Sequence, residues 1–222
     1  MSKIIKTTKR IASIILCIIM ATMLFACTAD KTNNNSQISD TGEKQSLSLK
    51  EQADYEMRHI DNPKVLATVN GHEITQVDMD SFNIDGRKHT IDELVKYYII
   101  YDYGVKNGWK MDERVVDSNK KIEDGMRNDS ELTDEYCQSE YGISLEEVIE
   151  ISMRRCNQAA MDVTFNKIVT DEVLSGECPK KHPELASAYK KYCKSENKFK
   201  AMEKMNDAYY EMIAEDYDVV IY

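Results

Sequence analysis

From Thr90 onward, the apolar positions of the chain recur mainly at helical spacing. Ile91, Leu94, Val95 and Tyr98 follow the i, i+3, i+4 period, which predicts a helix that ends near Gly108. A longer run, 144–174, contains no Gly or Pro and keeps the same spacing, which predicts a helix of about 45 Å at 1.5 Å per residue. Apolar residues after Pro183 predict a second long helix, and DVVIY at 218–222 predicts a short final strand. The expected fold class is therefore mostly α.

The segment VLATVNGHEIT at 65–75 has a different pattern. Two short β-prone runs flank Asn70-Gly71, a pair that favours the positive φ values of a type I′ turn. We therefore expect a β-hairpin here. The final strand 218–222 needs a partner for its backbone groups, so we expect it to join this hairpin and complete one small sheet.

Capping signals define the remaining helices. Thr90 with Glu93 and Ser144 with Glu147 have the spacing of capping boxes, and Thr75 with Asp78 resembles one. They support helix starts ahead of 76–82, 91–107 and 145–174. Further helices are expected at 112–126 and 131–141, and a short one between Leu47 and Arg58.

The N-terminus reads as a targeting segment. Residues 1–10 are basic, 11–25 are apolar, and the apolar run is too short to span a membrane comfortably. It ends in Leu-Phe-Ala-Cys, which resembles the lipobox of bacterial lipoproteins, although Phe25 is bulkier than usual. This resemblance implies removal of a signal peptide, 1–26, and acylation of Cys27 with fatty chains such as palmitate. The alternative is an uncleaved N-terminal anchor, and both place the rest of the chain outside the cytoplasm on a membrane surface.

Polar residues without an apolar period follow Cys27, so we expect a lipidated flexible tether at 27–59 and a single folded domain at 60–222. The whole chain has a net charge of −10. Without residues 1–26, 25 basic residues face 39 acidic ones, a net charge of −14. Such a chain repels phosphate backbones, which argues against nucleic-acid binding.

The order of these motifs resembles SurA/PrsA-type extracytoplasmic foldases. The segments that show this resemblance are VLATVNGHEIT before a capped helix, ELVKYYIIYDYGVKNGWKMDERVV, YGISLEEVIEISMRR and the terminal DVVIY. The resemblance covers roughly 65–174 and 200–222. It implies a SurA N-like or trigger-factor C-like chaperone domain built on long helices, which binds unfolded or newly exported polypeptides at the extracytoplasmic face of the membrane.

One departure from this family bears on activity. Family members often carry a parvulin-type prolyl isomerase domain between their helical parts, but here only residues 175–182 separate Leu174 from Pro183. A domain needs about 50 residues or more, so the isomerase is expected to be absent and no catalytic residue is assigned. Two alternatives stay open: a PrsA-like prolyl isomerase, and a scaffold lipoprotein for one dedicated envelope partner.

Site chemistry is sparse. The four histidines lack metal-ligand spacing, and no nucleotide-binding or nucleophile motif occurs, so neither metal nor cofactor is expected. Flexible thioethers on the long helices suit a surface that accepts varied apolar partners, although core filling is the ordinary role of each. Cys178 and Cys193 could form a disulfide, whereas Cys137 and Cys156 lie too far apart along their predicted helices to pair. The candidate client contacts are Met153, Met161, Met202, Met205 and Tyr209.

Overall fold

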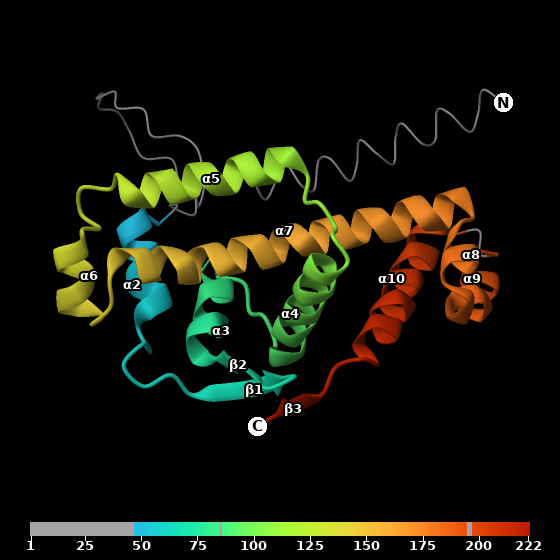
Figure 1. The fold of residues 1–222 in the computed structure, drawn as a ribbon, viewed down its shortest axis with the longest axis horizontal. Helices are drawn as coiled ribbons and strands as arrows, with labels where there is room; N and C mark the ends of the chain where they lie inside the picture. The colour runs from blue at the N-terminus through green and yellow to red at the C-terminus, as the bar shows by residue number, and fades with distance from the viewer. Residues whose placement is uncertain (1–46, 85, 195–196) are drawn as a thin grey trace, which may run out of the picture. The chain divides into compact units, whose positions relative to one another are not determined.

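The computed structural model describes residues 47–222 except 85, 195 and 196, and residues Leu49–Tyr222 form one compact unit. Helix α7 (Leu145–Ser175) runs through this unit, and α4 (Ile91–Lys106) and α10 (Lys198–Ala214) extend from it toward a small sheet (Figure 1). The predicted mostly α fold with a hairpin and a C-terminal strand is confirmed. The other helices are α2 (Leu49–Met57), α3 (Gln76–Asn83), α5 (Glu113–Arg127), α6 (Asp134–Glu140), α8 (Cys178–Lys181) and α9 (Ala186–Tyr192), with a 3-10 turn, η1 (Pro183–Leu185).

The sheet has three antiparallel strands in the order β2-β1-β3. Strands β1 (Val65–Val69) and β2 (His72–Thr75) form the predicted hairpin, and both turn residues have positive φ, 49° at Asn70 and 80° at Gly71. Strand β3 (Val219–Ile221) pairs with the other side of β1, with Val69 opposite Val219 and Ala67 opposite Ile221. The C-terminal strand therefore joins the hairpin, as expected.

The predicted helix caps form as the sequence indicated. The Thr90 hydroxyl accepts from the Glu93 amide, and the Glu93 carboxylate accepts from the Thr90 amide at 2.7 Å. Ser144 and Glu147 make the same reciprocal bonds at the start of α7, which ends at Gly176 with a left-handed φ of 74°. These bonds satisfy amides of the first turn that have no partner within the helix.

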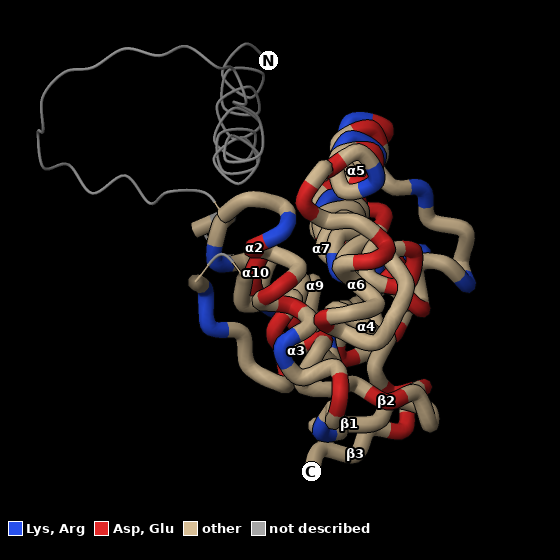
Figure 2. The backbone as a smooth tube through the Cα atoms, turned by 90° about the vertical axis from the view of Figure 1, so that its left-hand side faces the viewer, with Lys and Arg blue, Asp and Glu red and all other residues tan. Residues whose placement is uncertain are grey.

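The buried apolar residues form two clusters along α7. The larger one joins α4, α10, the sheet and the C-terminal half of α7 around Phe165, Ile99 and Met205, each 0% exposed. The smaller one joins α2, α5, α6 and the N-terminal half of α7 around Leu132 and Val148. Charged residues are frequent along α5, whose one buried residue is Met126 (Figure 2).

The expected boundary of the folded domain at residue 60 is wrong. The short helix predicted between Leu47 and Arg58 exists as α2, but it is part of the folded unit, because Ala53 and Met57 are each 1% exposed. Glu56 on α2 is also 1% exposed and pairs with Arg155 on α7 at 2.9 Å. Helix α2 is thus mostly polar, but its buried residues, Ala53, Glu56 and Met57, attach it to the core.

The single long helix expected after Pro183 is also wrong. The chain there forms η1, α9 and α10 in succession, and α10 starts afresh because the Asn197 side chain accepts from the Lys200 amide at 3.2 Å. An asparagine cap satisfies the first-turn amides of a new helix. The polar stretch CKSEN at 193–197 was the available sequence signal for this interruption.

Candidate functional site

Most of the predicted client-contact residues do not lie on the surface. Met161 (2% exposed), Met205 (0%) and Tyr209 (2%) belong to the larger core cluster, so their prediction as contact residues is wrong. Met153 and Met202 are only partly buried, each at the margin of a different cluster. The side chains of Met161, Met205 and Tyr209 pack into the larger cluster that α7 forms with α4, α10 and the sheet.

The four cysteines in the described part of the chain are all free thiols. Cys137 and Cys156 are unpaired, as expected, and the bond considered between Cys178 and Cys193 is not formed. Burial, together with the nearby charge of Glu172, raises the pKa of Cys178 to about 11. A thiol with so high a pKa is a poor nucleophile at neutral pH. Cys27 lies outside the described residues.

A cleft of about 490 Å³ lies between α4, α10 and β3. Its apolar lining comes from Val95 and Ile99 of α4, which are almost completely buried, from Tyr210 and Ala214 of α10, and from Val219 and Ile221 of β3. Its volume falls within the range of about 300–1,000 Å³ that is usual for ligand-binding clefts. The apolar side chains at its opening, chiefly Val219, Ile221 and Tyr210, can contact apolar side chains of a ligand.

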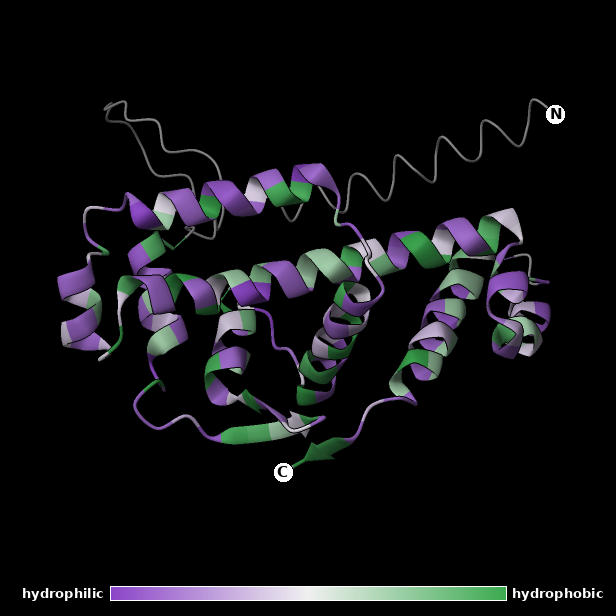
Figure 3. Ribbon diagram, viewed as in Figure 1, coloured by the Kyte–Doolittle hydropathy of each residue, from purple (hydrophilic) through white to green (hydrophobic). Residues whose placement is uncertain are grey.

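The apolar strand β3 is left unusually exposed. Val219, Val220 and Ile221 are 37%, 43% and 46% exposed, and Figure 3 shows the strand as a continuous hydrophobic segment. Since side chains alternate along a strand, Val219 and Ile221 share the face that borders the cleft, and Val220 lies on the opposite face. An apolar edge strand of this kind is a surface that other chains can pair with.

The outer edge of β3 also has backbone groups without strand partners. The Asp218 carbonyl accepts from the Asn70 amide at 2.8 Å, and the Tyr222 amide donates to the Leu66 carbonyl at 3.0 Å. In an antiparallel pair such bonds recur at every second residue. The amides and carbonyls of Val219 and Ile221 therefore point away from β1, toward the edge that no other described strand occupies.

Several polar contacts hold β3 in place. The Asn70 side chain, at the hairpin turn, accepts from the Asp218 amide at 2.7 Å. The Tyr217 hydroxyl donates to Asp102 on α4 at 2.6 Å. Burial raises the pKa of Tyr217, and the bond to Asp102 raises it further. The strand is thus fixed at its start both to the hairpin and to α4, so its open edge is a defined surface.

The cleft lining is acidic. Three carboxylates, Asp92, Glu93 and Asp207, line it together with one ammonium group, Lys96. The Lys96 ammonium already lies 5.1 Å from the centre of the Tyr210 ring, where it makes a cation–π contact. The backbone amide of Thr90 holds the pKa of Glu93 below its ordinary value, so this carboxylate stays ionised at neutral pH. Burial raises the pKa of Tyr210, and the charge of Asp92 adds to this effect.

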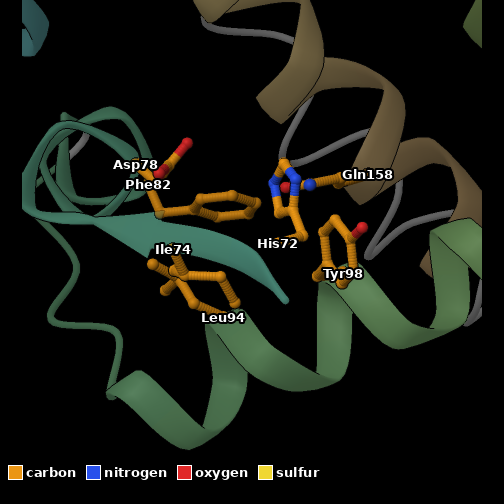
Figure 4. A pocket seen from close by; sticks show the side chains of 7 residues that line it. All are labelled: His72, Ile74, Asp78, Phe82, Leu94, Tyr98 and Gln158. Carbon is orange, nitrogen blue, oxygen red and sulfur yellow. The ribbon is translucent and has the colours of Figure 1, made fainter. Parts of the chain in front are cut away.

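A second cavity is too small to be a ligand site. Its volume is about 10 Å³, enough for roughly one water molecule. His72 stacks on Tyr98 there, with ring centroids 4.4 Å apart and planes 10° from parallel (Figure 4). The other lining side chains are Ile74, Asp78, Phe82, Leu94 and Gln158.

A titratable group of side chains lies near the end of α7. The Tyr209 hydroxyl lies 2.5 Å from His182 Nε2, which is 3.2 Å from the Glu172 carboxylate. Burial raises the pKa of Tyr209, with Glu172 next in importance. Lys181 also pairs with Glu172 at 3.0 Å. The group joins α7, α8 and α10, and it has the character of a structural ion-pair network.

Neither a metal-binding cluster nor a membrane-spanning helix is found among the described residues. Across residues 47–222, apart from the three that are not described, no cluster of His, Cys, Asp and Glu is arranged to hold a metal ion. No helix in the same region is long and apolar enough to cross a membrane.

Comparisons with protein-family models, with curated proteins and with solved structures found no match to this chain.

The cleft residues were not predicted as a site from the sequence. Val95 belongs to the apolar stripe of its helix and Ile99 to another apolar face, as in any buried helix, and Tyr210 and Ala214 carry no signal of their own. The one available signal was DVVIY, whose apolar residues were assigned to the sheet and not to a binding surface. Its position at the sheet edge depends on the pairing of residues far apart in the chain.

Proposed function

We propose that the chain is a chaperone-like lipoprotein, tethered to the extracytoplasmic face of the bacterial cell membrane, that binds unfolded or newly exported polypeptides. Binding takes place in the cleft between α4, α10 and β3, and no reaction is catalysed. The observation that carries the proposal is the apolar cleft of about 490 Å³ beside an exposed apolar strand.

The sequence supports the location and the general role. The basic, apolar, Leu-Phe-Ala-Cys order at the N-terminus favours a lipid on Cys27, and the resemblance to SurA/PrsA-type foldases favours a chaperone domain. A lipid on Cys27 would keep the folded unit close to the membrane, where exported chains emerge. The folded unit then offers apolar side chains to segments that are not yet buried.

The physical basis is reversible burial of apolar surface. Val219 and Ile221 are partly exposed in the free protein, and covering them with an apolar client segment removes their surface from water. Each 100 Å² of apolar surface buried contributes about 2.5 kcal/mol, before the entropy of ordering the client is subtracted. The resulting affinity is modest, which suits a protein that must release its clients.

The test measures aggregation of several unrelated unfolded proteins in the presence of the full-length chain in lipid vesicles. Two variants form a matched pair on one strand: Ile221→Glu places a charge in the cleft, and Val220→Glu places the same charge on the opposite face. We expect the wild type and Val220→Glu to suppress aggregation and Ile221→Glu to lose most of this effect. Circular dichroism melting of both variants checks that each remains folded.

Three results would overturn the proposal. They are no suppression by the wild type, equal suppression by the two variants, or one stoichiometric envelope partner in a pull-down without any broad client binding. A proline-limited refolding assay runs in parallel, and acceleration by the chain would favour the isomerase alternative. The proposal expects refolding at the uncatalysed rate.

A further inference from the structure

We infer that the occupant of the cleft is an extended segment that adds a strand to the open edge of β3 and carries Lys or Arg beside alternating apolar residues. This inference rests on the proposed function and names the class of segment that the site selects. Recognition then has two parts: backbone pairing with β3, and side-chain contacts with the cleft.

Backbone geometry favours a strand over a helix as the bound form. The amides and carbonyls of Val219 and Ile221 point away from β1, because Asp218 and Tyr222 make the bonds to it. A helix satisfies its own backbone groups and leaves this edge unpaired, whereas an extended segment bonds to it directly. Pairing sets the register, so every second side chain of the segment enters the cleft beside Val219 and Ile221.

The charges of the cleft favour a basic segment. The lining contains three carboxylates, Asp92, Glu93 and Asp207, and one ammonium group, Lys96. The Lys96 ammonium already contacts the Tyr210 ring. Asp207 has a partner at 3.1 Å, Lys204, but both side chains are about half exposed and such a pair is weak. A Lys or Arg of the segment would therefore gain from the lining, and an acidic residue would be repelled.

The same charges disfavour a second copy of this chain as the occupant. Pairing of two β3 strands would bring the acidic residues just before β3, Glu215, Asp216 and Asp218, toward the acidic lining of the partner. Like charges in close apposition oppose association. A basic, apolar segment from another protein meets no such repulsion.

The test uses three fluorescent synthetic peptides and the full-length chain in vesicles, with affinity measured by fluorescence anisotropy. The first peptide alternates Val with Thr and has Lys at both ends. The second has the same side chains but N-methyl groups on alternate amides, which remove the donors that would face β3. The third has Glu at both ends. We expect binding of the second to be at least about ten-fold weaker, because two hydrogen bonds are lost. The third should also bind more weakly, and added salt should weaken binding of the two Lys peptides but not of the Glu peptide.

A variant of the protein tests the same contact from the other side. Val219→Pro keeps an apolar side chain of similar size but removes an amide that points to the open edge, a position where proline is tolerated in a strand. We expect it to weaken the first peptide about ten-fold. Hydrogen exchange at Val65–Val69 should stay slow, since the bonds between β1 and β3 are retained.

The outcomes separate this inference from the proposed function. If the first two peptides bind equally while Ile221→Glu still abolishes aggregation suppression, backbone pairing is refuted and the proposed function stands. If no peptide binds and no client is protected, both fail. If the chain forms concentration-dependent dimers that Val219→Pro disrupts and the peptides do not bind, the edge pairs with a second copy and the inference is overturned.

Discussion

The buried ion pair between Glu56 and Arg155 allows a sharp test of how α2 is held to the rest of the molecule. Glu56 is 1% exposed, the Arg155 side chain is 16% exposed, and the two lie 2.9 Å apart. The Ser152 hydroxyl also donates to the Glu56 carboxylate. Burial raises the pKa of Glu56 above 4.5, against the opposing effects of Arg155 and Ser152. The perturbation is Arg155→Met, which leaves the carboxylate buried without its cation.

Most of the expected loss in the free energy of unfolding comes from protonation of Glu56. An uncompensated buried carboxylate takes up a proton, and holding it neutral at pH 7 against an unfolded pKa near 4.5 costs at most about 3 kcal/mol more than in the wild type, where burial already raises the pKa of Glu56. Loss of the bond from Arg155 to the Ser81 carbonyl, 3.0 Å, adds about 1 kcal/mol. For a folded unit of this size, this upper limit of about 4 kcal/mol corresponds to a fall in Tm of about 8–16 °C.

The pH dependence identifies the cause. In the variant, the folded pKa of Glu56 lies well above its unfolded value, so the folded state binds the extra proton. The free energy of unfolding of the variant, relative to wild type, should therefore rise as pH falls from 7 toward 4.5, by at most about 1.4 kcal/mol per pH unit. Below 4.5, where both states are protonated, the difference becomes constant.

The assay is urea unfolding followed by circular dichroism between pH 4.5 and 7.5. Glu56→Gln in the Arg155→Met background should restore most of the stability at pH 7 and remove the pH dependence. Lys167→Met is a surface control on the same helix, because its pair with Asp171 is exposed and should contribute less than about 1 kcal/mol. A loss that does not change with pH, or that Glu56→Gln does not relieve, would show that the buried carboxylate is not the cause of the destabilisation.

Three further predictions concern the sheet, the core and the anchor. Truncation after Asp216 removes β3 and should lower the free energy of unfolding by about 2–4 kcal/mol; unchanged hydrogen-exchange protection at Val65–Val69 would contradict the role of β3. Met205→Ala should destabilise by about 2–5 kcal/mol in thermal unfolding, since Met205 is 0% exposed, and equal losses for Met153→Ala would contradict the assigned burial. Cys27→Ala should abolish the diacylglyceryl N-terminus seen by mass spectrometry and release the chain from the membrane fraction; a variant that stays membrane-bound would support the uncleaved anchor instead.

Local features of the fold were predictable because each depends on residues close together in the sequence. Asn70-Gly71 determines the hairpin turn, since both positions need a positive φ that few other pairs adopt without strain. Thr90 with Glu93 and Ser144 with Glu147 determine helix starts, because the cap bonds join residues three apart. The pairing of β3 with the hairpin was predicted on a different ground: its backbone groups needed a partner, and the sequence offered no other strand.

Burial along the helices was decided only by the tertiary structure. The helical spacing of Met161, Met205 and Tyr209 does not distinguish a buried apolar residue from an exposed one. Only the packing of α4, α10 and the sheet against α7 places these three inside. The break between α9 and α10 was missed because apolar periodicity continues across it, while the Asn197 cap outweighs that periodicity locally. The polar segment that became α2 enters the core through Glu56 and its partner Arg155, far away in the chain.

The candidate site likewise belongs to the tertiary structure. The sequence determines that 218–222 is an apolar strand and that Asp92 and Glu93 start a helix, because composition and capping are local properties. Their assembly into one acidic, apolar cleft with an open strand edge requires β3 to pair with β1 and α10 to lie beside α4. Those contacts join residues more than a hundred positions apart, and no spacing rule within one segment encodes them.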